Sequence, residues 1–183
     1  MHGGGFPNYF SVIENAIKDI LFNSGHSRKP IFDRLVVSVD AEENTYDQKR
    51  SDVESCIRDR LNGTYLDYKI IVQNFCLEAW CLGNRKIISK SNNNADLKVF
   101  TRHYDVRSSD PELLTPSDPE RLTRAQHAKN YLRVALQNKH KNLTYTSSNP
   151  TALLNKKYYE QLKSRLIETQ HIQSFQDFLD AFK

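Results

Sequence analysis

The feature that most constrains the fold of this chain is a short apolar run that ends abruptly in carboxylates. Residues 35–39 are rich in valine and predict a β-strand buried on both faces, as in parallel sheets. Asp40, Glu42 and Glu43 follow this strand directly. Because ligands of open α/β sheets bind beyond the carboxyl ends of the strands, we expect these acids to face a site rather than the core.

The spacing of the first two acids suits a divalent metal ion. Side chains two residues apart in an extended backbone point to the same side, so Asp40 and Glu42 are expected to converge. Carboxylate oxygens are the hard ligands that Mg²⁺ and Mn²⁺ prefer. The pattern therefore predicts an Mg²⁺ or Mn²⁺ site at Asp40 and Glu42. In the alternative interpretation Asp40 only terminates the strand, and Glu42 and Glu43 are solvated loop charges.

A strand–helix–strand unit surrounds this acidic segment. Thr45 and Gln48 have the pattern of a capping box, which predicts a helix from residue 45 to about residue 61. A second short buried strand is predicted at residues 68–72. Because the crossover of such a unit is right-handed and returns the chain in the same direction, we expect the two strands to be parallel.

One carboxylate lies in an otherwise apolar segment after the second strand. Residues 75–82 are predicted to form a largely buried helical turn, and Glu78 lies in its middle. A buried acid is costly unless it meets a cation, a metal or a network of hydrogen-bond donors. Two interpretations follow: Glu78 is a half-exposed helix acid, or it is a third acid aimed at the ends of the strands.

Together these segments resemble the second half of a TOPRIM domain. The strand that ends in Asp-x-acid, the helix, the short strand and the sequence Phe-Cys-Leu-Glu-Ala-Trp at residues 75–80 are similar to bacterial TOPRIM-like proteins related to the RloB and OLD nucleases of phage defence. Residues 102–106, 110–112 and 171–175 also resemble the C-terminal pattern of that group. The resemblance is most specific over residues 32–84 and looser over the remainder.

The resemblance implies roles for three acids. In TOPRIM enzymes an Asp-x-Asp pair binds the divalent metal, and the matching positions here are Asp40 and Glu42, where glutamate keeps the charge on a longer arm. Glu78 matches the acid of the Glu-Ala-Trp segment. The resemblance thus implies a catalytic group of Asp40, Glu42 and Glu78 with Mg²⁺ or Mn²⁺ as the cofactor.

The chain departs from the TOPRIM pattern before this region. TOPRIM domains carry a glutamate, usually followed by glycine, after a first strand, and it serves as general acid or base. No such strand or Glu-Gly pair precedes residue 32, where the only acids are Glu14 and Asp19. We therefore expect little nuclease activity from this chain alone, and activity once a longer N-terminus or a partner protein contributes a glutamate.

The remainder of the chain is predicted to be a connector followed by helices. The expected domains are a TOPRIM-like α/β core at residues 1–84, a polar and basic connector at 85–116 and a helical subdomain at 117–183. Helices are expected at residues 118–138, 150–169 and 174–182, the first with Pro119 in its first turn.

Charge is divided unevenly along the chain. Residues 1–84 carry 9 Lys+Arg and 12 Asp+Glu, whereas residues 85–183 carry 17 and 10, so the net charges are −3 and +7. This division suits a polyanion held by one half and processed by the other, and it is also compatible with an ordinary soluble protein. The candidate contacts to a nucleic-acid backbone are Arg102, Arg121, Arg124 and Lys129. The same side chains also fit a solvated surface.

Length and cysteine content limit the remaining classes of protein. At 183 residues the chain is long enough for one core with a helical appendage. It contains no apolar run long enough to cross a bilayer and no signal-like segment at its start. Cys56, Cys76 and Cys81 lack zinc-finger spacing, which favours reduced thiols in a cytoplasmic protein.

The sequence as a whole predicts an α/β domain with a small parallel sheet flanked by helices, and a C-terminal helical subdomain. The first functional hypothesis is a metal-dependent nuclease, or a nuclease subunit, that acts on DNA or RNA in phage defence. An ATPase and a further copy of the chain are the protein partners considered with it, and no membrane partner is expected. The alternative is a non-catalytic binding or assembly subunit whose partner supplies the chemistry.

Overall fold

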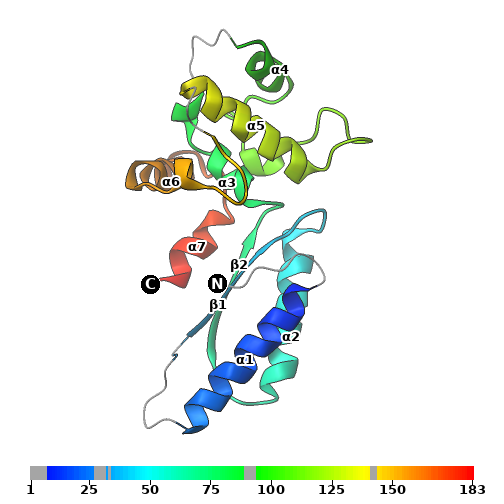
Figure 1. Cartoon of the computed structure of the whole chain (residues 1–183), viewed down its shortest axis with the longest axis vertical. Helices are drawn as coiled ribbons and strands as arrows, with labels where there is room; N and C mark the ends of the chain where they lie inside the picture. Colours follow the sequence, from blue (N-terminus) through cyan, green and yellow to red (C-terminus); the bar gives the residue numbers. More distant parts are fainter. Residues whose placement is uncertain (1–7, 27–31, 33, 89–93, 141–143) are drawn as a thin grey trace. The chain divides into compact units, whose positions relative to one another are not determined.

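The computed structural model describes residues 8–26, 32, 34–88, 94–140 and 144–183. Within these residues the chain forms seven α-helices and one sheet of two parallel strands, which confirms the predicted α/β class and small parallel sheet (Figure 1). The strands are β1 (Arg34–Asp40) and β2 (Asp67–Gln73). The helices are α1 (Tyr9–His26), α2 (Tyr46–Leu61), α3 (Leu77–Leu82), α4 (Ala95–His103), α5 (Arg124–Lys139), α6 (Lys156–Thr169) and α7 (Phe175–Ala181).

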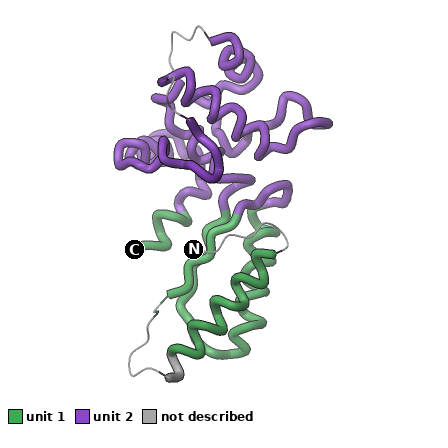
Figure 2. Tube along the Cα trace, in the orientation of Figure 1, with its two compact units in different colours: residues 1–39, 46–72, 177–183 green, residues 40–45, 73–176 purple. Residues whose placement is uncertain are grey.

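The chain divides into two compact units (Figure 2). Unit 1 comprises the described residues of 1–39, 46–72 and 177–183, and unit 2 those of 40–45 and 73–176. These units divide the chain at places other than the predicted domain boundaries at residues 84 and 116. The acidic loop after β1 and the short helix α3 belong to unit 2, together with the helices that follow them.

Unit 1 is the strand–helix–strand element with α1 added to it. Its core consists of one apolar face from each helix, one face of β1 and the buried residues of β2, namely Ile13, Ile17, Ile20, Val53, Ile57, Leu61, Leu35, Val37, Ile70, Ile71 and Val72. The faces repeat at helical spacing along α1 and α2, which is why these two helices pack against each other. The predicted helix after the acidic loop is confirmed, since α2 begins directly after Thr45.

The two strands differ in how they are buried. In β1, burial alternates, so that Leu35 and Val37 are buried while Val36 is 37% exposed. The prediction that this strand is buried on both faces is therefore wrong. An apolar run cannot by itself distinguish a strand covered on both faces from one covered on a single face. By contrast, β2 buries three successive residues, Ile70, Ile71 and Val72, which requires cover on both of its faces.

Polar contacts hold the last residues of the chain against the other segments of unit 1. The Tyr46 hydroxyl donates a hydrogen bond to the Asp177 carboxylate. Burial, and then the charge of Asp177, raise the pKa of Tyr46 to about 12, so the hydroxyl keeps the proton that it donates. Arg34 donates from Nε to Asp67 at 2.6 Å and from Nη1 to the carbonyl of Ala181 at 3.0 Å. These contacts hold residues 177–181 against the strand–helix–strand element.

Unit 2 departs from the predicted helix boundaries. The first predicted helix of the C-terminal region was expected at residue 118, but α5 begins at Arg124. A complete capping box explains this start, because Thr123 accepts from the Gln126 amide while the Gln126 side chain accepts from the Thr123 amide. The Asp118 carbonyl instead accepts from the Arg121 and Leu122 amides in a turn. The second predicted helix also begins later, since α6 starts at Lys156 rather than at residue 150.

A buried carboxylate joins three segments of unit 2. Glu112 accepts hydrogen bonds from Trp80 Nε1 at 3.1 Å and from the backbone amide and the hydroxyl of Ser174. Trp80 Nε1 also approaches Ser174 Oγ at 2.7 Å, and the Phe175 ring packs edge-on against Trp80 with 5.2 Å between ring centroids. Burial raises the pKa of Glu112, and the hydrogen bonds from Ser174 and Trp80 oppose that shift. We call this network the Glu112 hub.

A second buried polar side chain fixes the loop that precedes the hub. Arg165 of α6 is fully buried and donates hydrogen bonds to three backbone carbonyls, those of Val106, Arg107 and Ser109, at 2.8–3.0 Å. It also contacts His171 Nδ1 at 2.7 Å. Buried carbonyl groups need donors, and a guanidinium offers five N–H groups in a fixed fork. Arg165 therefore determines how residues 106–109 fold over α6.

Replacement of this arginine tests its structural role. Arg165→Met keeps an apolar stem of similar length but leaves the three carbonyls without their donor. We expect the free energy of unfolding to fall by about 3 kcal/mol, because each buried unsatisfied polar group costs roughly 1–3 kcal/mol. Chemical denaturation measures the change. Arg133→Met, at an exposed position of α5, is the matched control, and equal losses in both variants would contradict the prediction.

Candidate functional site

The acidic loop lies where the two parallel strands end. Two backbone hydrogen bonds hold it beside the end of β2: the Ala41 amide donates to the Gln73 carbonyl at 2.9 Å, and the Glu42 amide donates to the Phe75 carbonyl at 3.0 Å. Asp40, Glu42 and Glu43 are all exposed. The strand–helix–strand unit thus presents carboxylates beyond the carboxyl end of β1, where ligands of such sheets bind.

The backbone of this loop differs from the extended form that the sequence predicted. β1 ends at Asp40, and Glu42 has a φ of +56°, in the left-handed region. The argument that Asp40 and Glu42 point to the same side is therefore wrong, because it requires an extended backbone through Glu42. Asp40 instead closes the strand, whereas Glu42 lies within the turn that the hydrogen bond from the Asn44 amide to the Ala41 carbonyl closes.

Backbone strain is present at the ends of both strands. Phe75, whose carbonyl accepts from Glu42, also has a positive φ of +54°. Left-handed backbone costs a non-glycine residue roughly 1–2 kcal/mol, so surrounding contacts must hold it in place. The Phe75 ring is fully buried, and the Arg124 guanidinium lies 4.2 Å from its centroid. Strain of this kind is concentrated at functional sites, which makes this pair of turns a candidate site.

Glu78 is held by a hydrogen-bond donor of unit 2. It is only 8% exposed, and its Oε1 accepts a hydrogen bond from the Tyr145 hydroxyl at 2.7 Å. The interpretation of Glu78 as a half-exposed helix acid is therefore wrong. Burial, followed by Glu78, raises the pKa of Tyr145, so this tyrosine stays protonated and continues to donate.

Cys76 connects Glu78 electrostatically with the acidic loop. Burial raises the pKa of the Cys76 thiol, and the charges of Glu78 and of Asp40 raise it further. Both carboxylates therefore lie close enough to the thiol to act on it. A buried thiol near carboxylates suits a packed region better than a nucleophilic site, because a reactive cysteine needs a positive environment.

The acids present two candidate ligands for a metal ion rather than three. Among the described residues, no group of three or more His, Cys, Asp or Glu side chains is placed to hold a metal. Asp40 and Glu42 are exposed carboxylates, and Glu78 is buried with one oxygen engaged by Tyr145. Mg²⁺ is commonly bound through one or two carboxylates and retains several waters. Of the three acids, Asp40 and Glu42 are exposed to an ion in solution, whereas Glu78 is not.

Two of the four predicted nucleic-acid contacts lie beside the acidic loop. The Arg124 amide donates to Glu43 at 3.3 Å. A pocket of about 400 Å³ adjoins this contact and is lined by Glu43, Pro116, Pro119, Glu120, Arg121, Leu122, Thr123 and Arg124. The Arg121 side chain is 85% exposed and makes one contact with Asp118, at 3.5 Å. It is available to a ligand at this pocket.

The other three predicted contacts, Arg124 included, differ from Arg121 in their surroundings. The Arg124 guanidinium donates to the carbonyls of Glu112 and Leu114 at 2.8 and 3.3 Å while it covers Phe75, so it supports the loop rather than offering a free charge. Arg102, in the last turn of α4, and Lys129, on α5, are exposed. Neither of these two residues lines the pocket beside the acidic loop.

Tyr145, the hydrogen-bond donor to Glu78, is not among the residues that the sequence predicted for the site. Tyr145 lies in a polar segment after α5, 67 residues from Glu78 along the chain. It is buried although its neighbours from Thr146 to Asn149 are exposed. The only available signal was a single aromatic residue in a polar loop, and such a residue does not identify its partner.

Comparisons with known proteins add no relationship to this geometry. No protein-family model matches the chain, and neither a curated protein nor a solved structure matches it significantly. In the part of the chain that the structure describes, no helix is both long and apolar enough to cross a lipid bilayer.

The contact between Tyr145 and Glu78 can be tested directly. Tyr145→Phe keeps the ring but removes the donor from a buried carboxylate, and we expect the free energy of unfolding to fall by about 1–3 kcal/mol. Tyr65→Phe, at a 90% exposed position, is the control and should have no effect. Thermal melting of both variants measures the difference. An unchanged melting temperature for Tyr145→Phe would show that Glu78 does not depend on this donor.

Proposed function

We propose that this chain acts on nucleic-acid phosphodiesters as a metal-dependent nuclease, or as a subunit of one. The acidic loop carries the proposal: exposed Asp40 ends a parallel strand, and exposed Glu42 follows it in a strained turn. Arg121, in the pocket that Glu43 also lines, adds a positive charge near the acidic loop. Acids that hold a cation and a cationic side chain that contacts phosphate are two of the groups that phosphodiester chemistry uses.

The proposed roles follow from where each side chain lies. Asp40 and Glu42 would hold Mg²⁺ or Mn²⁺, which when bound polarises a phosphate and neutralises the charge that develops on it. Arg121 would contact a backbone phosphate from the pocket. Tyr145 holds Glu78 in place, so Glu78 supports the loop region through α3 and is not assigned as a metal ligand.

The proposal includes a relationship to TOPRIM-like proteins. It also includes three features that rest on this resemblance alone: a role in phage defence, an ATPase partner and assembly with further copies of the chain. All three cysteines are free thiols, which suits a reducing compartment such as the cytoplasm.

A second candidate function is a non-catalytic binding or assembly subunit. The observation that favours it is the burial of Glu78, whose carboxylate accepts a hydrogen bond from Tyr145 and does not join the exposed acids of the loop. In this alternative the acidic loop is structural and a partner protein supplies the chemistry. A measurement of metal binding at Asp40 and Glu42 distinguishes the two functions, because only the nuclease function requires a metal there.

Calorimetry with Mn²⁺ tests the proposed metal site. We expect weak binding to the wild-type protein and no measurable heat with the double variant Asp40→Asn, Glu42→Gln, because both hard ligands are then neutral. The double variant Asp19→Asn, Asp47→Asn removes the same charge from exposed positions of α1 and α2 and should bind as the wild type does. Identical heats for the wild type and the first variant would favour the binding-subunit function.

The salt dependence of nucleic-acid binding tests the contact assigned to Arg121. Arg121→Gln should weaken binding of a labelled DNA duplex regardless of its sequence. The slope of log K against log salt should become shallower by about one, the change expected for one lost phosphate contact. Arg58→Gln, at an exposed position of α2, is the control and should leave the slope unchanged. An unchanged slope for Arg121→Gln would remove this residue from the interface.

A further inference from the structure

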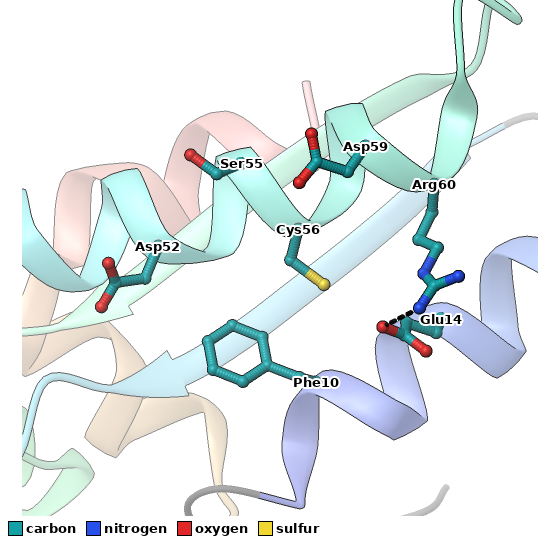
Figure 3. Close-up of a pocket in the computed structure, with 7 residues that line it drawn as sticks. All are labelled: Phe10, Glu14, Asp52, Ser55, Cys56, Asp59 and Arg60. Atoms are coloured by element: carbon teal, nitrogen blue, oxygen red, sulfur yellow. Dashed lines mark hydrogen bonds and ion pairs between the residues drawn. The ribbon is translucent and has the colours of Figure 1, made fainter.

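A groove between α1 and α2 in unit 1 is separate from the acidic loop (Figure 3). It has a volume of about 720 Å³ and is lined by Phe10, Glu14, Asp52, Ser55, Cys56, Asp59 and Arg60. Binding pockets commonly have volumes of roughly 300–1,000 Å³, so the groove is large enough to take several side chains of a ligand.

The groove has an apolar floor. The Phe10 ring from α1 and the Cys56 thiol from α2 point into the space between the two helices (Figure 3). Both residues are only partly buried, so each still offers apolar surface to an occupant. A floor of this kind suits a hydrophobic anchor side chain, which gains free energy when its apolar surface leaves water.

The walls of the groove are acidic, and two of their carboxylates lack a cation. Glu14 is paired with Arg60 at 2.6 Å. Asp52 and Asp59 are exposed, and neither forms an ion pair within the described residues. Burial, followed by the charge of Glu14, raises the pKa of Cys56, with Asp59 adding to the shift and Arg60 opposing it. The electrostatic potential in the groove is therefore negative, which excludes a nucleic acid as its occupant.

The spacing of the acids matches a helical or extended peptide. Asp52, Cys56 and Asp59 lie at positions i, i+4 and i+7 of α2, so the acids stand one turn on either side of the thiol. A basic peptide could place an anchor over Cys56 and Phe10 and a cation against each acid. We propose that this groove is a docking site for a basic, amphipathic peptide segment of a partner protein. The proposal does not depend on the nuclease function.

Cys56 provides a direct readout of occupancy. It is the only cysteine of the chain that is not buried, since Cys76 and Cys81 both are. The probe is a synthetic amphipathic peptide of lysine and leucine, and the control probe has glutamate in place of lysine. We expect the lysine peptide to slow the alkylation of Cys56 in the full chain, and the glutamate peptide to leave the rate unchanged. Equal rates with and without the lysine peptide would overturn the proposal.

A pair of double variants tests the role of the acids. Asp52→Asn, Asp59→Asn should weaken binding of the lysine peptide about tenfold, the effect of losing two exposed ion pairs of roughly 0.7 kcal/mol each. Asp19→Asn, Asp47→Asn removes equal charge outside the groove and should bind as the wild type does. Equal weakening in both would mean attraction by net charge alone and would overturn the proposal. Sedimentation that shows self-association lost with Asp52→Asn, Asp59→Asn would also overturn it, because the occupant would then be a second copy.

Discussion

The carboxylate of Glu112 has to be hydrogen-bonded because it is buried, and much of unit 2 is arranged around that requirement. Trp80 and Ser174 supply the donors, from segments 32 and 62 residues away along the chain. Phe175 completes the cover over Trp80. The segments around residues 80, 110 and 174 were noted in the sequence only as parts of one family-like pattern. In the structure these three segments converge at the Glu112 hub.

The acidic loop depends on the same region through Arg124. This guanidinium donates to the carbonyls of Glu112 and Leu114 and covers the ring of Phe75, whose left-handed backbone in turn accepts the amide of Glu42. A chain of contacts thus runs from the hub to the loop within unit 2. Because the strained turns at Glu42 and Phe75 persist only where neighbours hold them, the geometry of the candidate site is maintained from the helices that follow the sheet.

Two acidic surfaces of the molecule suit different ligands because their surroundings differ. The acidic loop carries exposed carboxylates next to an exposed arginine, a combination that suits a cation and a phosphate together. The α1–α2 groove carries carboxylates around an apolar floor, and the basic residue that lines it, Arg60, is paired with Glu14. Charge alone would group these surfaces together. Burial, ion pairing and the apolar atoms between the acids distinguish them.

The sequence by itself determined the local elements: an apolar run, a capping pattern at Thr45 and a second apolar run were sufficient for β1, α2 and a parallel β2, because these signals act between near neighbours. It also placed Asp40 and Glu42 after a strand. Only the tertiary structure decided which acids remain exposed. Glu78 is held by a hydrogen bond from Tyr145, which lies 67 residues away along the chain. The other segments of the fold cover β1 on one face and leave its other face exposed. Such contacts join distant segments, whereas the periodicity of a sequence reports only on its immediate neighbours.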